Sequence, residues 1–246
     1  MAIWRLMGLL ILVLALSTAP AWGTTLTGFV SNPTQNSVNW TAAALGMGAA
    51  INTNIDFETH PLGALQSNFY LVSDGVTLTA TGDVNNVWYG NGPNDGNTFS
   101  TPLSSGEGLH VASNYLHDGG AVSSLALTFN QPVLGAGLFV IDYFNPFGDN
   151  PLTIGAYTGP NGTGTYLGGF TSVAYNFQPD HLYFMGLLSD VADIRSVVFT
   201  DVNSNTGDRT GIDNIRFAVP AIPEPVTMAG LFFGLASLGA YVRRRR

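Results

Sequence analysis

The stretch VSSLALTF, from Val122 to Phe129, shows a clear β-strand pattern in this chain of 246 residues. Leu125, Leu127 and Phe129 are apolar, and the residues between them are alanine and threonine. Because successive side chains of a strand point to opposite faces of the sheet, this alternation predicts a strand with one buried face and one polar face. A half-buried strand of this kind is typical of antiparallel sheets.

Strand patterns recur on both sides of this stretch, separated by turn signals. The further predicted strands are Asn54–Thr59, Gly75–Thr81, Gly137–Phe144, Leu152–Thr158, Tyr166–Val173, Ile194–Thr200 and Ile212–Val219. GPNGTG and FGDNP are turns by composition, and we find no convincing amphipathic helix between the strands. About eight to eleven strands at this spacing predict an all-β fold, an antiparallel β-sandwich, over residues 51–219. Residues 24–50 carry a weaker signal, which indicates a leading strand or an N-terminal arm.

The composition narrows the classes of partner. Charged residues make up 10% of the chain, well below the ~25% of typical soluble proteins. Between residues 24 and 219, three arginines stand against fifteen acidic residues. This acidic balance disfavours nucleic acid and anionic lipid, and it favours divalent cations or good solubility among polysaccharides. The chain has no cysteine, which excludes disulfides, zinc–thiolate sites and thiol nucleophiles.

The N-terminus has the three parts of a secretory signal peptide. Met1–Arg5 is short and positive, Leu6–Leu16 is an uncharged apolar run, and small residues follow it. The apolar run is too short to span a bilayer. We therefore expect residues 1–23 to direct export and to be removed by signal peptidase after Ala21 or Gly23.

The C-terminus contains a second apolar segment followed by positive charge. Val226–Val242 carries no charged residue and would be about 25 Å long as a helix. Four arginines follow it: Arg243, Arg244, Arg245 and Arg246. Because guanidinium groups are costly to place in hydrocarbon, they are expected to stay in the cytoplasm. The sequence therefore predicts a single transmembrane helix that holds the exported body at the inner membrane.

A proline-rich neck precedes the apolar segment. Pro223, Glu224 and Pro225 form a stiff, extended stretch that a processing enzyme can reach. The order of this neck, the apolar helix and the terminal arginines resembles the PEP-CTERM sorting signal of Gram-negative bacteria that make exopolysaccharide. The resemblance covers only the tail, residues 220–246. It implies removal of the tail by an exosortase, a membrane-embedded cysteine transpeptidase-like enzyme, and delivery of the body to the cell surface or extracellular matrix.

Short motifs in the body resemble the jelly-roll domains that are common in PEP-CTERM proteins. The matching stretches are IDFETHPLG…GVTLTATGD, which begins at Ile55, and GIDNIRF, which begins at Gly211. These domains are similar in outline to carbohydrate-binding modules and other lectin-like jelly rolls. The resemblance implies that the first and last strands lie side by side and that acids on them hold a structural calcium ion.

Oxygen-bearing side chains form the candidate calcium site. DVNSNTGD, from Asp201 to Asp208, places such side chains at alternate positions of a loop, an arrangement that suits calcium. The candidate ligands are Asp56, Glu58, Asp201, Asn203, Asn205, Asp208 and Asp213. The loop is not an EF-hand, because Thr206 and Ile212 stand where glycine and glutamate are needed. The alternative is a polar turn whose side chains bond their own backbone.

The alternation of side chains along a strand predicts one direction for Asp213 and does not favour the same direction for Asp56 and Glu58. Asp213 has the parity of Ile215 and should point inward, where a carboxylate needs a metal, an arginine or backbone donors. Asp56 and Glu58 have the opposite parity to Phe57, which argues against their convergence with Asp213.

Trp88 and Tyr89 are the candidate sugar-binding residues. They lie in NNVWYGNGPNDGN, among amide and carboxylate side chains that could bond sugar hydroxyls. An exposed aromatic face beside such groups indicates carbohydrate binding. The alternative is that these aromatic residues belong to the core of the sandwich.

Signatures of catalysis are absent from the sequence. The chain has no Gly-x-Ser-x-Gly elbow, no His-Glu-x-x-His pair and no phosphate loop. The expected role is therefore non-catalytic, namely binding or organising exopolysaccharide. The alternatives are a structural or adhesive surface protein without a sugar site, and a secreted glycosidase or lyase, since the spatial separation of paired carboxylates is not visible in a sequence.

Overall fold

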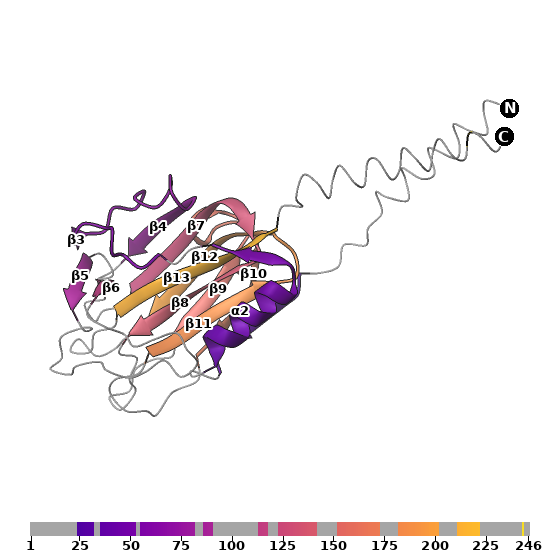
Figure 1. Ribbon diagram of the computed structural model, residues 1–246, viewed down its shortest axis with the longest axis horizontal. Helices are drawn as coiled ribbons and strands as arrows, with labels where there is room; N and C mark the ends of the chain where they lie inside the picture. Colours follow the sequence, from indigo (N-terminus) through magenta and orange to yellow (C-terminus); the bar gives the residue numbers. More distant parts are fainter. Residues whose placement is uncertain are drawn as a thin grey trace.

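The computed structural model describes residues 24–31, 35–52, 55–81, 86–90, 113–117, 123–141, 152–172, 182–201 and 211–221, together with Arg243. Within these residues two antiparallel sheets face each other as a β-sandwich (Figure 1). The predicted antiparallel β-sandwich is therefore confirmed, in a described body that is mostly, but not entirely, β.

The larger sheet has eight strands in the order β1-β11-β8-β13-β6-β5-β3, with β2 pairing with β13. In this order the strands are β1 (Leu26–Phe29), β11 (Leu182–Ser189), β8 (Gly135–Ile141), β13 (Gly211–Pro220), β6 (Ser113–His117), β5 (Asn86–Gly90) and β3 (Gly63–Ala64), and β2 is Ala49–Ile51. All of these pairings are antiparallel.

The smaller sheet has five strands in the order β10-β9-β12-β7-β4. These are β10 (Tyr166–Thr171), β9 (Thr153–Tyr157), β12 (Ile194–Asp201), β7 (Ser123–Val133) and β4 (Val76–Thr81). The predicted turn GPNGTG joins β9 to β10 and contains a short 3-10 helix, η1 (Pro160–Gly162). The predicted turn FGDNP lies outside the described residues.

The alternation that predicts β7 is present in the structure. Leu125, Leu127 and Phe129 are buried in the core between the two sheets, whereas Ser124 and Thr128 are only partly buried on the other face. Residues of both sheets contribute to this core, including Leu138 of β8 and Ile154 of β9. Burial of these apolar side chains is the main driving force for pairing the sheets.

The predicted strand Asn54–Thr59 is not formed. Ile55 makes one isolated antiparallel bridge to Ile215 of β13, and the chain then turns at Phe57, whose φ is +59°. The amide of His60 donates to the Phe57 carbonyl and closes the turn. A positive φ takes Phe57 out of the extended region, so the period-two pattern here belongs to a bridge and a turn.

Strand β11 was not predicted from the sequence. Its residues from Tyr183 to Ser189 are all buried, because one face lies inside the sandwich and the other packs against a helix. A strand that is buried on both faces has no alternation of apolar and polar residues.

That helix, α2 (Asn36–Gly46), contradicts the expectation of no helix. Its buried stripe consists of Asn36, Trp40 and Ala44, which are four residues apart. Asn36 is polar and donates from Nδ2 to the Phe184 carbonyl at 3.0 Å, so the stripe does not look apolar in the sequence. Trp40 donates from Nε1 to the Leu187 carbonyl at 3.1 Å, which fixes the helix on β11.

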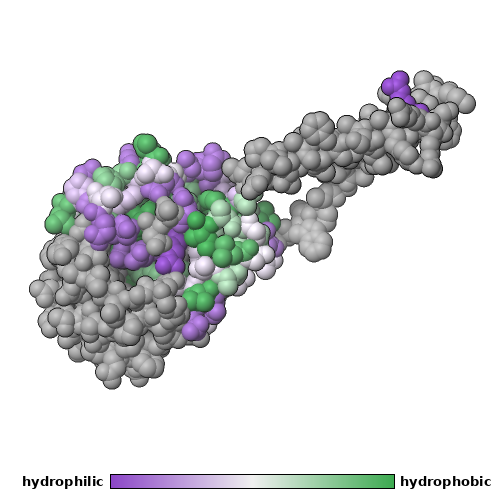
Figure 2. All heavy atoms as spheres, viewed as in Figure 1, coloured by the Kyte–Doolittle hydropathy of each residue, from purple (hydrophilic) through white to green (hydrophobic). Residues whose placement is uncertain are grey.

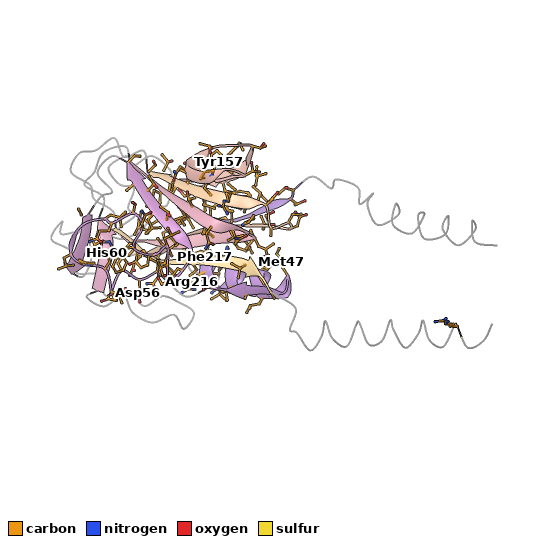
Figure 3. The ribbon with its side chains drawn as sticks, turned by 90° about the horizontal axis from the view of Figure 1, so that it is seen from above. Met47, Asp56, His60, Tyr157, Arg216 and Phe217 are labelled. Atoms are coloured by element: carbon orange, nitrogen blue, oxygen red, sulfur yellow. The ribbon has the colours of Figure 1, made fainter. Side chains whose placement is uncertain are left out.

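Helix α2 covers the outer face of the larger sheet and forms a second core with it. Trp40 and Ala44 pack there with Phe139, Phe184 and Leu188. Figure 3 shows α2 and Tyr157 of the smaller sheet on opposite sides of the sandwich. In the described part of the chain, no α-helix covers the outer face of the smaller sheet, and the short 3-10 helix η1 lies against β12 and β7 on that face.

No helix among the described residues is both long and apolar enough to cross a membrane. The predicted span Val226–Val242 and the predicted signal peptide, residues 1–23, lie outside those residues. Pro223, Glu224 and Pro225 lie outside them as well.

Candidate functional site

Three rows of residues cross the outer face of the smaller sheet beside η1, roughly at right angles to its strands. The first row contains two aromatic rings, Tyr166 of β10 and Tyr157 of β9, which are register partners. Their ring centroids are 5.2 Å apart at an interplanar angle of 49°. Tyr166 is 58% exposed and Tyr157 is half-buried, so the pair presents aromatic surface to solvent.

The second row projects less from the sheet than the first, because two of its residues are glycines. Gly169 of β10 pairs with Gly155 of β9, and Val198 of β12 pairs with Gly155 on the other side. A Cβ atom on Gly155 would lie 3.2 Å from Tyr166 Cε2 and 3.4 Å from Tyr157 Cε2. The missing side chain therefore lets both tyrosine rings pack close to Gly155.

The third row carries hydroxyl groups. Thr171 of β10, Thr153 of β9 and Thr200 of β12 are paired across the three strands. They alternate with the buried side chains of Ile154 and Phe199, so they share the outer face with the tyrosines.

Together the rows form a groove of about 400 Å³, here called the tyrosine groove. Its lining residues are Thr153, Ile154, Gly155, Tyr157, Tyr166, Gly169, Phe170, Thr171, Val198 and Thr200. None of these residues carries a charge. The tyrosine row and the threonine row form its walls, and the glycine row forms its floor.

The turn around η1 supports the tyrosine wall. The amide of Gly162 donates to Ser196 Oγ at 2.9 Å, and Ser196 Oγ donates to the Gly159 carbonyl at 2.6 Å. Thr128 Oγ1 accepts from the Asn161 amide at 2.9 Å. These bonds hold the turn on β12 and β7 beside Tyr157, so the wall is preorganised for a ligand.

The tyrosine groove has the composition of a binding site. Aromatic faces carry partial negative charge and suit the C–H faces of a sugar ring, and hydroxyl groups can donate to or accept from sugar hydroxyls. Among the described residues that line it, none has a carboxylate, imidazole or amine group.

The structure brings three predicted calcium ligands into one region. The bridge between Ile55 and Ile215 places Asp56 and Glu58 near the start of strand β13, where Asp213 lies. Asp213 is 2% exposed and accepts from the amide of Asn214 at 2.7 Å. The inward direction predicted from strand parity does not follow from this burial, because a register shift after Asp213 breaks the alternation of β13. Asp213 pairs with Phe139, which packs in the core formed with α2, whereas Ile212 pairs with Val140 of the core between the sheets. Figure 3 shows Asp56 and His60 at the end of the sandwich away from Met47.

Tyr70 lies at the centre of this acidic region and was not predicted. Its side chain is 4% exposed, and its hydroxyl has no hydrogen-bond partner among the residues that the structure describes. Burial raises the pKa of Tyr70 well above its usual value, and the negative charges of Asp56, Asp74, Asp213 and Glu58 raise this pKa further. Tyr70 therefore stays protonated at neutral pH, with a buried donor among carboxylates.

These groups do not form a closed metal site by themselves. Among the residues that the structure describes, no three histidine, aspartate or glutamate side chains lie close enough together to hold a metal ion. Asp201 is the last residue of β12, and its side chain lies outside the described part, as do Asn203, Asn205 and Asp208.

Trp88 and Tyr89 lie in β5, opposite Tyr115 and Asn114 of β6. The side chains of these strand residues lie outside the described part, so sugar binding by Trp88 and Tyr89 stays a prediction.

The tyrosine groove itself was missed by sequence reasoning. A signal was available, because Thr153, Gly155 and Tyr157 share one parity and Ile154 and Ala156 share the other. The row that joins Tyr157 to Tyr166 depends on strand register and on the bulge between Tyr166 and Gly168, which one sequence does not specify.

Comparisons with known proteins give distant structural similarities only. No protein-family model and no curated protein sequence matches the chain. The K3 cleaved adhesin domain of Lys-gingipain from Porphyromonas gingivalis w83 is similar, with 16% identity, 70% of this chain and 99% of that chain covered, and a TM-score of 0.39. A family 29 carbohydrate-binding module has 11% identity, coverage of 72% and 99%, and a TM-score of 0.34.

An F5/8 type C domain from Bacteroides fragilis has 8% identity, coverage of 66% and 99%, and a TM-score of 0.31. Fragments of glycoside hydrolases are also similar, among them part of a GH29 fucosidase from Ruminococcus gnavus with a TM-score of 0.31. These similarities are too low to carry an argument about function, which must come from the site itself.

Proposed function

We propose that this chain is an exported, non-catalytic protein that binds extracellular polysaccharide in the tyrosine groove. The observation that carries the proposal is the pair of tyrosine rings, 5.2 Å apart, beside a glycine floor and a threonine wall. Ligand sites combine apolar and aromatic walls with a few placed polar groups, and the groove has both.

The preferred ligand is an uncharged polysaccharide. The groove offers neutral hydroxyl groups and aromatic faces, and no cationic group that would replace the hydration of a carboxylate or sulfate. The excess of acidic residues in the body adds a general repulsion of anionic polymers. A chain of neutral sugars has no such cost.

Affinity electrophoresis against a panel of neutral and uronic-acid polysaccharides tests this function. We expect retardation by at least one neutral polysaccharide, and Tyr166→Ala should lower the affinity about tenfold, because it removes an exposed stacking surface worth ~1–1.5 kcal/mol. Leu62→Ala, at a residue that is also largely exposed but outside the groove, is the matched control.

The alternatives make different predictions in the same assay. A structural or adhesive protein without a sugar site gives no retardation by any polysaccharide. A glycosidase or lyase releases new reducing ends from the polysaccharide. Retardation that Trp88→Ala abolishes and Tyr166→Ala does not would move the sugar site to β5.

Export and sorting complete the proposal. Residues 1–23 direct secretion, the segment Val226–Val242 holds the precursor in the inner membrane, and an exosortase cuts near Pro223-Glu224-Pro225. The support is the hydropathy and charge order of the two chain ends and the PEP-CTERM resemblance. The body then reaches the cell surface or matrix, where polysaccharide is available.

We also propose that a calcium ion stabilises the structure by linking the turn at Phe57 to the start of β13. It is favoured by the unpartnered hydroxyl of Tyr70 and by the carboxylates of Asp56, Glu58 and Asp213 around it. Calcium takes carboxylate, carbonyl and water oxygens in flexible geometry, so the ion and its waters would fill spaces that the carboxylates alone do not close.

A further inference from the structure

Both ends of the described body leave the sandwich at the same end. Leu26 of β1 pairs with Ser189, the Ser189 amide donates to the Leu134 carbonyl, and the Leu134 amide donates to the Ala218 carbonyl. This chain of contacts crosses β1, β11, β8 and β13, which are neighbours in the larger sheet. Three strand spacings amount to about 14 Å, so Thr24 and Ala221 lie close together at this end of the larger sheet.

Apolar side chains gather at this end. A groove of about 440 Å³ lies between β1, α2 and β11, and its apolar lining is Phe29, Ala43, Met47, Leu134 and Leu188. Leu45 and Met47 at the end of α2, and Val191 after β11, are large apolar side chains that are exposed. Figure 2 shows apolar surface on the side of the body from which the chain ends leave.

The acidic residues here are fixed by hydrogen bonds. Asp190 Oδ1 accepts from the Thr25 amide at 2.9 Å, and Asp193 Oδ2 accepts from Thr24 Oγ1 at 2.5 Å. The carboxylates are therefore used to hold the first residues of the body on β11. The apolar side chains of α2 beside them keep their exposed surface.

The tether to the predicted membrane segment is short. Four residues, Ile222 to Pro225, separate Ala221 from Val226. A fully extended chain spans at most ~3.6 Å per residue, so Ala221 lies within about 18 Å of Val226. If Val226 begins the membrane span, this end of the sandwich is held at the bilayer surface.

We propose that Leu45, Met47, Val191 and the adjoining groove form a membrane-facing end, which lies on the phospholipid bilayer in the unprocessed precursor. The inference rests on the membrane insertion of Val226–Val242 in the proposed function, and it is independent of the tyrosine groove. Large apolar patches on a soluble domain mark interaction sites, and the position of the tether selects lipid as the partner.

The experiment uses the full chain in phosphatidylcholine vesicles. Because the chain has no cysteine, Leu45→Cys and Leu62→Cys each carry one environment-sensitive fluorophore at a unique position. The two leucines are 58% and 61% exposed, and only Leu45 lies at the membrane-facing end. Nitroxide-labelled lipid is expected to quench the Leu45 label at least threefold more than the Leu62 label, and Val191→Cys should behave like Leu45→Cys.

Three outcomes would overturn the inference, and they are distinguishable. Vesicle-bound chain with equal quenching at both sites shows that the body is inserted by its tail but does not lie on lipid. A label at Leu45 that is shielded without vesicles, in a concentration-dependent way, shows a second copy on this face. A chain that does not fractionate with vesicles refutes the membrane insertion on which the inference rests, and leaves polysaccharide binding unaffected.

Discussion

Gly155 is the residue whose missing side chain lets the two tyrosine rings pack close to the sheet. An alanine methyl group would lie 3.2 Å from the Tyr166 ring and 3.4 Å from the Tyr157 ring, both of which can move slightly. We expect Gly155→Ala to change stability by less than ~1 kcal/mol and to weaken polysaccharide binding about tenfold, because the methyl group displaces the two rings that form the wall of the groove. Affinity electrophoresis and urea unfolding on the same variant measure the two effects.

Gly169 is the matched comparison, because it is the register partner of Gly155. A Cβ atom there would lie 2.5 Å from the Ile154 carbonyl oxygen, which is backbone and cannot move away easily. Gly169→Ala should therefore lower stability, whereas Gly155→Ala should lower binding. Equal loss of stability in both variants would show that the glycines serve packing alone.

Tyr70 connects the acidic region to the proposed calcium ion. A buried hydroxyl without a partner costs ~1–3 kcal/mol, so Tyr70→Phe should raise the free energy of unfolding by about 1 kcal/mol in chelator. With calcium present the order should reverse, because the hydroxyl then bonds the ion or its water. Thermal melting of both proteins in chelator and in calcium measures this. If calcium leaves the melting temperature of both proteins unchanged, the proposed calcium ion is refuted.

At the scale of elements, α2 holds the larger sheet together from outside. Trp40 is fully buried, lies with its ring centroid 5.9 Å from that of Phe184, and donates to the Leu187 carbonyl. Trp40→Ala should lower the free energy of unfolding by about 3–5 kcal/mol, because it leaves a large cavity and an unpaired carbonyl. Leu45→Ala, on the exposed side of the same helix, should cost less than ~0.5 kcal/mol.

Urea unfolding measures both variants of α2. The tyrosine groove lies on the opposite side of the sandwich, so folded Trp40→Ala protein should keep its affinity for polysaccharide. Loss of binding in a variant that is still folded would show that the two outer faces are coupled.

The elements also show where sequence patterns succeed and fail. Strand β7 is predicted because it is half-buried, so apolar and polar residues alternate along its sequence. Strand β11 and helix α2 are not predicted because they pack on each other. Strand β11 is buried on both faces and has no polar face, and the buried face of α2 includes the polar residue Asn36. The predicted strand at Asn54–Thr59 fails because Phe57 turns the chain.

For the whole molecule, the sequences of the two chain ends predict where the mature protein begins and ends. Removal of residues 1–23 and of a tail that begins near Pro223 leaves a body without its apolar ends and without the terminal arginines. Intact-mass measurement on protein from its native host should give a first residue of Trp22 or Thr24 and a C-terminus near Pro225. A host protein with both encoded ends would contradict export and sorting together.

The sequence by itself determined the fold class and the hydropathy and charge order of the two ends, because each is a property of neighbouring residues. The tertiary structure alone decided the tyrosine groove, the acidic surroundings of Tyr70 and the apolar end beside Thr24 and Ala221. Each of these needs residues from several strands or from a strand and a helix, and strand order and register bring them together. Register is set by packing of the whole sandwich, so no single stretch of sequence contains it.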